Sequence, residues 1–350
     1  MKKIMKSYSA LFTIEFKYIL FWVIIISILC IIITLYYRKY KENYDGNDMK
    51  PLTPIKTLDF TNTFQKEING IPLQFYYSNS AIIESPDEPD TYILNVRCIN
   101  YKIEGYTYVN HYHKTISINK CLLLDNQFRM IDDTVIDNNI NDNNTGVEDI
   151  RLYMDNDEIY YSGTAFDNNS GVMKISNNKY RITENQLYLI PNIIKVEFNT
   201  PFTVEKNWAY FDGVIGKCVI YQWYPLKICK IIDHKRLVEI ENKTMPEAFK
   251  DFRGSSCGIL YKDQIWFIVH KKIFNDNNHI IHYFVCFDKY MNLIKYSRSF
   301  CFEKYDIEYC MSFIIKDDQI VIPYTVKDTI LKLGIYDRKY IMDDLGYTYV

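Results

Sequence analysis

The sequence lacks the short motifs by which many enzymes and metal-binding proteins are recognised. None of its nine cysteines forms a Cys-x-x-Cys pair, so neither a zinc ribbon nor a thioredoxin-like site is supported. A glycine-rich phosphate loop and a Gly-x-Ser-x-Gly turn are also absent. Strands and helices do not alternate along the chain, which argues against a nucleotide-sugar transferase of the Rossmann type.

An excess of charge of one sign is missing as well. The formal net charge is -2 over 350 residues, so nucleic acid is disfavoured as a partner. The Asp- and Asn-rich runs at residues 137–144 and 275–278 lack the glycine and terminal glutamate of a calcium loop. His270 and His282 adjoin apolar runs and are expected to be structural. We therefore expect no metal and no resident cofactor.

One long apolar run is present near the N-terminus. Residues 18–37 contain no charged side chain, and about 20 such residues cross a hydrocarbon core of about 30 Å. A cleaved signal peptide is the alternative, but the exit from the run, Leu35-Tyr36-Tyr37-Arg38-Lys39, offers no small-residue cleavage site. The run therefore predicts a transmembrane helix that anchors the chain.

The flanks of this run predict its orientation and the domain limits. Four lysines precede it, whereas the three basic residues that follow are soon diluted by acidic ones, which favours a cytoplasmic N-terminus. We expect a tail at residues 1–17, a transmembrane helix at 18–37, a polar stalk at 38–64 and a domain at 65–350. That domain is expected to be lumenal or extracellular.

Short strands bounded by Asn, Asp, Gly or Pro fill the remainder, so the expected class is all-β. A polar cluster, a strand, a turn and an aromatic-rich strand recur roughly every 50 to 60 residues, the length of a four-stranded propeller blade. A β-sandwich would not explain why the clusters fall at matching points. We predict a five-bladed β-propeller whose clusters converge on its axis. The clusters are Asn95-Val96-Arg97, Glu148-Asp149, Lys206-Asn207-Trp208, Arg253-Gly254-Ser255 and Ile307-Glu308-Tyr309.

The run Glu148-Asp149-Ile150-Arg151 puts two carboxylates and a guanidinium at the start of a predicted strand. An isolated run of this kind is most often a solvated ion pair. Its position in one of the recurring clusters favours a site instead, because matching points of the blades meet in one axial pocket.

These segments resemble the five-bladed propellers of β-mannoside phosphorylases, glycoside hydrolase family 130, and the related β-1,2-mannosyltransferases. Membrane-anchored versions in giant DNA viruses are similar. The acidic run resembles the family's Glu-Asp-Pro-Arg motif, with Ile150 in place of proline. The resemblance implies that Asp149 is the general acid toward the glycosidic oxygen. It also implies that inorganic phosphate, held by basic residues, is the nucleophile.

Phosphate or an activated sugar would be a co-substrate. Phosphate needs positioning and charge neutralisation rather than a second carboxylate, and arginine suits it through a bidentate fork. The candidate substrate-binding residues are Arg151, Lys206 and Arg253 for the anion, Arg97, Asn207, Glu148 and Glu308 for sugar hydroxyls, and Trp208 or Tyr224 for stacking on a sugar face.

The predicted function is that of a membrane-anchored mannoside phosphorylase or mannosyltransferase that binds a glycan or glycosyl phosphate. The alternative is a non-catalytic propeller that binds glycans or proteins, because a shared fold does not guarantee a working site.

Overall fold

The computed structural model describes residues 22–23, 25–34, 50–105, 107–137, 140, 144–183, 186–273, 279–304 and 306–350, with only the backbone at 133–135. The chain divides into two compact units, Met1–Met49 and Lys50–Val350. The second unit contains all of the strands that follow.

In the first unit, residues 22–23 and 25–34 are helical. Ser27 Oγ donates to the Val23 carbonyl at 2.8 Å and Thr34 Oγ1 to the Cys30 carbonyl at 2.7 Å, bonds that hydroxyls commonly make within a helix. No helix among the described residues is long and apolar enough to cross a membrane. Much of the predicted span 18–37, and all of the predicted tail, lies outside those residues. The transmembrane helix therefore stays a prediction.

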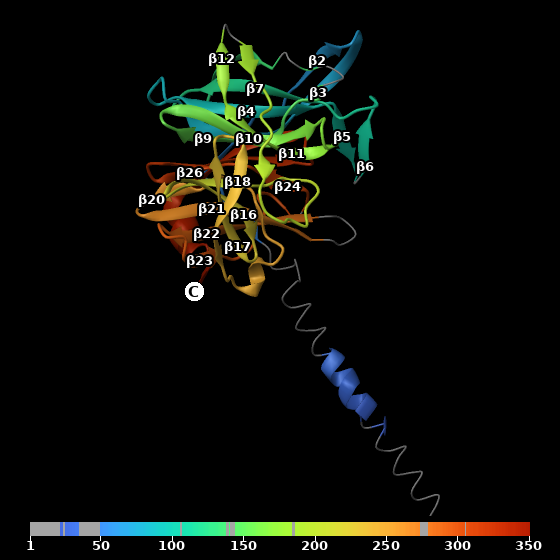
Figure 1. Cartoon of the computed structure of the whole chain (residues 1–350), viewed down its shortest axis with the longest axis vertical. Coiled ribbons are helices and arrows are strands. Elements are labelled where there is room, and N and C mark those ends of the chain that lie inside the picture. The colour runs from blue at the N-terminus through green and yellow to red at the C-terminus, as the bar shows by residue number, and fades with distance from the viewer. Residues whose placement is uncertain are drawn as a thin grey trace, which may run out of the picture. The chain divides into compact units, whose positions relative to one another are not determined.

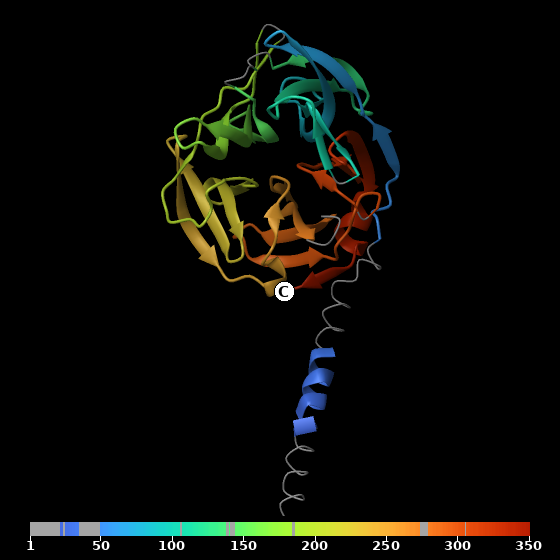
Figure 2. The same ribbon diagram turned by 90° about the vertical axis from the view of Figure 1, so that its right-hand side faces the viewer.

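Five sheets form a ring in the second unit, which confirms the predicted all-β, five-bladed propeller (Figures 1 and 2). Blade 1 contains β2 (Thr63–Ile68), β3 (Ile71–Glu84), β4 (Tyr92–Ile99), β7 (Ser117–Leu124) and β8 (Met130–Ile136). A hairpin of β5 (Tyr101–Glu104) and β6 (Thr107–Asn110) is inserted between β4 and β7. Blade 2 contains β9 (Glu148–Asp155), β10 (Glu158–Asp167) and β11 (Val172–Lys179), followed by the pair β12 (Arg181–Thr183) and β13 (Gln186–Tyr188).

The remaining blades follow in chain order. Blade 3 contains β15 (Ala209–Gly213), β16 (Gly216–Trp223), β17 (Leu226–Ile232), β18 (Arg236–Lys243) and, parallel to β18, β14 (Lys195–Val196). Blade 4 contains β19 (Arg253–Gly254), β20 (Ile259–Tyr261), β21 (Gln264–Ile273), β22 (His279–Asp288), β23 (Leu293–Ser297) and β28 (Tyr347–Tyr349). Blade 5 contains β24 (Glu308–Cys310), β25 (Ile314–Lys316), β26 (Gln319–Val326), β27 (Ile330–Asp337) and β1 (Lys56–Asp59). Two single-turn helices are also present, the 3-10 helix η2 (Glu247–Phe249) and the π-helix η3 (Tyr340–Asp344).

Both faces of each sheet are buried, because neighbouring blades pack face to face. In β21, Ile265, Phe267 and Val269 pack into a cluster with blade 3, whereas Trp266 and Ile268 pack into a cluster with blade 5. This alternation follows from the two-residue period of a strand. Five such clusters occupy the five junctions between neighbouring blades and close the ring. The apolar run at 265–269 is therefore a strand between two other sheets.

The two ends of the second unit help to hold the ring together. β1 pairs with β27 of the last blade, and β28 returns to pair with β23 of blade 4. β1 and the start of β2 fall within residues 38–64, the predicted stalk. The prolines and polar residues of this segment gave no indication of strands, but the sheet structure begins before residue 65.

The innermost strands of the blades are the C-terminal half of β3, then β9, β15, the interrupted pair β19 and β20, and the interrupted pair β24 and β25. Four of the five predicted polar clusters lie at the start of such a strand. The cluster at Asn95-Val96-Arg97 is the exception, because it lies on β4, the second strand of blade 1. The matching residues of blade 1 are Ser78-Asn79-Ser80 in β3.

Candidate active site

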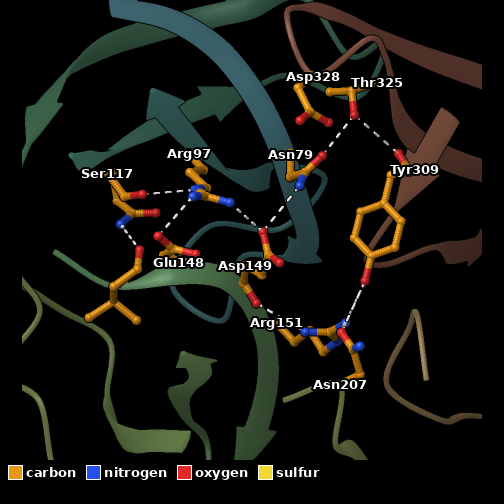
Figure 3. A network of polar contacts seen from close by, with 12 residues as sticks. Asn79, Arg97, Ser117, Glu148, Asp149, Arg151, Asn207, Tyr309, Thr325 and Asp328 are labelled. Atoms are coloured by element: carbon orange, nitrogen blue, oxygen red, sulfur yellow. Dashed lines mark hydrogen bonds and ion pairs between the residues drawn. The ribbon is translucent and has the colours of Figure 1, made fainter. Parts of the chain in front are cut away.

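Polar groups from all five blades meet where the innermost strands begin, and Figure 3 shows the side chains from blades 1, 2, 3 and 5. Blade 1 contributes Asn79 and Arg97, blade 2 Glu148, Asp149 and Arg151, blade 3 Asn207, blade 4 the carbonyls of Gly254 and Ser255, and blade 5 Tyr309. We call this group the axial site. The predicted convergence on the axis is thus present.

Asp149 lies at the centre of the axial site. Arg97 Nη1 contacts Asp149 Oδ1 at 2.8 Å, and Asn79 Nδ2 donates to the same oxygen at 3.1 Å. Its backbone φ is 50°, a left-handed conformation that Asp tolerates better than most residues. The side chain keeps 26% of its accessible surface, so it is in contact with solvent.

The charges around Asp149 decide its protonation. Burial alone would raise the pKa of Asp149, but Arg97 and Arg151, with the hydrogen bonds from Asn79 and Arg97, hold this pKa below its ordinary value. The carboxyl group is therefore ionised at neutral pH. This is the opposite of what a proton donor needs in the unliganded site.

Arg97 joins the two acidic side chains. Its Nη2 lies 3.1 Å from Glu148 Oε1, its Nε donates to Ser117 Oγ at 2.9 Å, and the residue is 5% exposed. The side chain of Glu148 keeps 30% of its accessible surface. One buried guanidinium thus holds two accessible carboxylates side by side.

Arg151 connects four blades and does not face a ligand. Nε donates to the Ser255 carbonyl at 2.7 Å, Nη1 to the Asp149 carbonyl at 3.0 Å, and Nη2 to the Gly254 carbonyl at 3.1 Å. Nη2 also lies 3.2 Å from Tyr309 Oη and 3.3 Å from Asn207 Oδ1. The residue is 2% exposed. The sequence predicted that Arg151 holds an anion directly. In the structure its donors are used by groups of the protein, so Arg151 positions the site instead.

A pocket of about 250 Å³ adjoins the axial site between blades 3 and 4. Lys206, Asn207, Arg253 and Gly254 line it, and Asn207 and Gly254 are also partners of Arg151. Lys206 and Arg253 are exposed. Within the part of the chain that the structure describes, neither has an ion pair or a side-chain hydrogen bond. Two unpaired cations beside a polar network favour an anionic ligand.

The sequence matches no family model and no curated protein. Solved structures are similar to it nevertheless. A glycosyl hydrolase from Bacteroides ovatus has 12% identity and a TM-score of 0.57, with 84% of this chain and 92% of the other covered. The β-1,2-mannobiose phosphorylase of Listeria innocua, in complex with β-1,2-mannobiose, has 10% identity and a TM-score of 0.52, with 81% and 99% covered. The mannose phosphorylase MPT-4 of Leishmania mexicana, in complex with a phosphate ion, has 11% identity and a TM-score of 0.51, with 90% and 98% covered.

This chain has the fold of these enzymes. At 10 to 12% identity the likeness establishes the five-bladed fold and no residue's role. The resemblance stated from the sequence is thus confirmed for the fold.

Three residues that the sequence predicted to bind the sugar are instead packed or hydrogen-bonded within the protein. The Trp208 ring lines the pocket but is 1% exposed, and its Nε1 donates to Glu205 Oε2 at 3.3 Å. Tyr224 packs against the apolar cluster between blades 3 and 4. Glu308 is fully buried and accepts hydrogen bonds from the backbone N–H groups of residues 302–304. Burial raises the pKa of Glu308 to about 7. It stabilises a loop and does not face a ligand.

The sequence reasoning missed Asn79, Tyr101 and Asp328. Asn79 belongs to the blade 1 cluster that was placed on β4, and a correct register of that blade would have found it. Asp328 lies in the turn between β26 and β27, where Asp is common and carries no signal. Tyr101 Oη donates to Asp328 Oδ2 at 3.4 Å. The contact joins blade 5 to the β5–β6 hairpin, and no local pattern predicts it.

Proposed function

We propose that this protein cleaves or transfers mannoside-type glycans at the axial site, with phosphate or an activated sugar as co-substrate. One observation carries the proposal: Arg151 links the site of the carboxylates Glu148 and Asp149 to Asn207 and Gly254, which line a pocket with Lys206 and Arg253, two cations that have no ion pair among the described residues. Carboxylates next to an anion site are the minimum that glycoside phosphorolysis requires. Similar structures bind β-1,2-mannobiose in one case and phosphate in another.

The pocket between blades 3 and 4 is where we place the phosphate. Lys206 and Arg253 both line this pocket, and Arg151 donates to the carbonyl of Gly254, which lines it too. Burial and these cations hold the pKa of His270 well below its ordinary value, so this histidine adds no further positive charge. A bound phosphate would neutralise the two exposed cations. A pocket of about 250 Å³ suits a small polar molecule.

The sugar would bind over Glu148, Asp149 and Asn207. These side chains present carboxylate and amide groups that hydrogen-bond hydroxyls, and Asn207 borders both the axial site and the pocket. Asn207 has a φ of 62° at the entry to β15, as Asp149 has a φ of 50° at the entry to β9. The same local conformation in two blades turns both side chains toward the axis.

The test is turnover by the purified full-length protein in detergent. We expect it to convert β-1,2-mannobiose and phosphate to mannose and mannose 1-phosphate, or to transfer mannose from mannose 1-phosphate or GDP-mannose. Asp149→Asn should lower turnover by about 10²-fold or more while binding of the sugar persists. Asp125→Asn, which changes a carboxylate paired with Arg129 in blade 1, is the matched control and should leave turnover unchanged.

A non-catalytic glycan-binding propeller is the second candidate, and the ionised state of Asp149 favours it. A carboxylate held by Arg97 can bind sugar hydroxyls without transferring a proton. Such a protein would retain β-1,2-mannobiose unchanged, and Asp149→Asn would weaken that binding.

We further propose that residues 18–37 anchor the protein in a membrane, with the propeller on the lumenal or extracellular side. In support, Ile26, Leu29 and Ile33 are exposed apolar side chains on the described helical residues. Fractionation tests this proposal. The full-length protein should sediment with membranes and a chain that begins at Lys50 should be soluble, whereas a soluble full-length protein would refute it.

A further inference from the structure

Asp328 is the carboxyl group of this region that the proposed mechanism does not yet use. It lies in the turn between β26 and β27, with a φ of 58°. In Figure 3 it lies beside Thr325 and near Asn79, at the edge of the axial site. Thr325 Oγ1 donates to Asn79 Oδ1 at 2.7 Å, and Asn79 in turn donates to Asp149 at 3.1 Å. Blade 5 thus places a second aspartate at the site.

Charged and titratable groups from four elements lie around Asp328. Arg97 of β4 and Asp149 of β9 act on it electrostatically, and Tyr101 of β5 donates a hydrogen bond to it. Tyr108 of β6 stacks near Tyr101, with ring centroids 5.4 Å apart, and is also influenced by Asp328. Among the described residues, the Arg97 guanidinium contacts Glu148, Asp149 and Ser117, and Asp328 lies outside this ion pair.

The environments of Asp149 and Asp328 push their proton affinities apart. Burial raises the pKa of Asp328 to about 6; Arg97 and the Tyr101 hydrogen bond oppose the rise, and the negative charge of Asp149 adds to it. Asp149 has a lowered pKa because Arg97 and Arg151 outweigh its burial. Two neighbouring carboxyls with opposite shifts are the usual arrangement of an acid and an ionised partner.

We propose that Asp328, rather than Asp149, donates the proton to the departing oxygen of the glycoside. This inference rests on the proposed function. A phosphate oxygen forms the new bond to the anomeric carbon as the bond from that carbon to the glycosidic oxygen breaks. The electron pair of the broken bond goes to the glycosidic oxygen, which takes the Asp328 proton and leaves as a neutral alcohol. Solvent returns a proton to Asp328, and Asp149 stays ionised throughout.

The decisive experiment compares two leaving groups in the full-length protein. β-1,2-mannobiose needs a proton on its leaving oxygen, whereas 2,4-dinitrophenyl β-mannoside does not, because dinitrophenolate is stable as an anion. Asp328→Asn should lose about 10²-fold or more in kcat/KM on mannobiose and less than about 10-fold on the aryl mannoside. Asp149→Asn should lose activity on both. Asp317→Asn is the control, because Asp317 is an exposed turn residue with a φ of 52°.

Each outcome separates this inference from the proposed function. Selective rescue of Asp149→Asn by the aryl mannoside would assign the proton to Asp149 and overturn our proposal. Equal losses of Asp328→Asn on both substrates would overturn it too, with the proposed function intact. A wild-type protein that turns over neither of these substrates, and that transfers no mannose from mannose 1-phosphate or GDP-mannose, would refute the proposed function and the proposal with it.

A second readout does not depend on turnover. Since the folded protein holds the Asp328 proton to a higher pH than the unfolded chain, this group's contribution to stability is lost as the pH rises from about 4 to above 6. The Tm of the wild type should therefore fall relative to that of Asp328→Asn across this range. Parallel Tm curves for the two proteins would contradict the assignment.

Discussion

The same five innermost strands make two very different ends along the propeller axis. Where they begin, Asn79, Asp149, Asn207 and Tyr309 form a polar network around Arg151. Three to five residues later, or about 10 to 17 Å along a strand, they line a cavity of about 210 Å³. The residues of this apolar end include Ile82, Leu152, Phe211, Leu260 and Phe313.

This difference separates what the fold requires from what a ligand requires. Apolar residues close the ring at one end without a buried guanidinium, so a ring of five blades can close without a charged centre, although a network already built around Arg151 depends on it. Buried charged networks seldom add net stability relative to apolar packing. We infer that the polar end is kept for what it binds.

The largest effect should come from making the polar end apolar at its centre. Arg151→Met leaves the carbonyls of Asp149, Gly254 and Ser255 without their donor, so the free energy of unfolding should fall by about 3 kcal/mol or more. Denaturant unfolding measures this change. Arg129→Met, which removes an exposed arginine paired with Asp125, should cost about 1 kcal/mol or less. Similar losses in the two variants would show that Arg151 is not the centre of the network.

Glu308 separates structural from ligand-binding residues at the polar end, because it is a polar residue there with a structural role. Its pKa of about 7 exceeds the ordinary value, so the folded state retains a proton that the unfolded state has lost. The contribution of Glu308 to the free energy of unfolding should be fully present below a pH of about 4.5. It should then fall by about 1 kcal/mol per pH unit up to about pH 7. Glu308→Gln should abolish this decline in pH-dependent unfolding, with turnover per folded molecule unchanged. A large loss of turnover would place Glu308 in the site instead.

The sequence predicted the fold better than the site for a physical reason. Strand length, turn residues and a repeat of roughly 50 to 60 residues are local properties, and they were sufficient for five blades. The site depends on which residues of distant blades face one axis. Asp149 and Arg151 share one strand, so the sequence indicated both together. Tyr101 and Asp328, in contrast, are 227 positions apart in the sequence, and neither segment contains a pattern that predicts their contact.

Burial also changed the role of individual residues. A buried arginine and an exposed one look alike in a sequence, yet Arg151 uses its donors within the protein and Arg253 remains exposed. Trp208 and Tyr224 likewise have aromatic rings of the kind that stack on sugars, but they pack into the apolar clusters between blades. Only the packing of neighbouring blades decides which side chain faces a ligand.

A smaller effect is expected from the cations beside the polar end. Lys206→Met and Arg253→Met should each raise the KM for phosphate by about 10-fold, since each removes one charge-assisted contact. Their kcat should change less. Lys217→Met is the matched control, because Lys217 lines the apolar end and pairs with Asp212. A KM for phosphate that responds to Lys217 but not to Lys206 would place the anion site at the apolar end.

The smallest effect is expected at the apolar end, and it decides whether the two ends act independently. Leu260 lines the cavity there and is 60% exposed, so Leu260→Ser removes little buried area and should change stability by about 0.5 kcal/mol or less. Turnover should be unchanged, because Leu260 lies six residues beyond Gly254, the blade 4 partner of Arg151. Kinetics and denaturant unfolding on the same preparation measure both quantities. A severalfold loss of turnover with normal stability would mean that substrate or product also contacts the apolar end. A substitution that does not change stability should not alter the polar end through the fold.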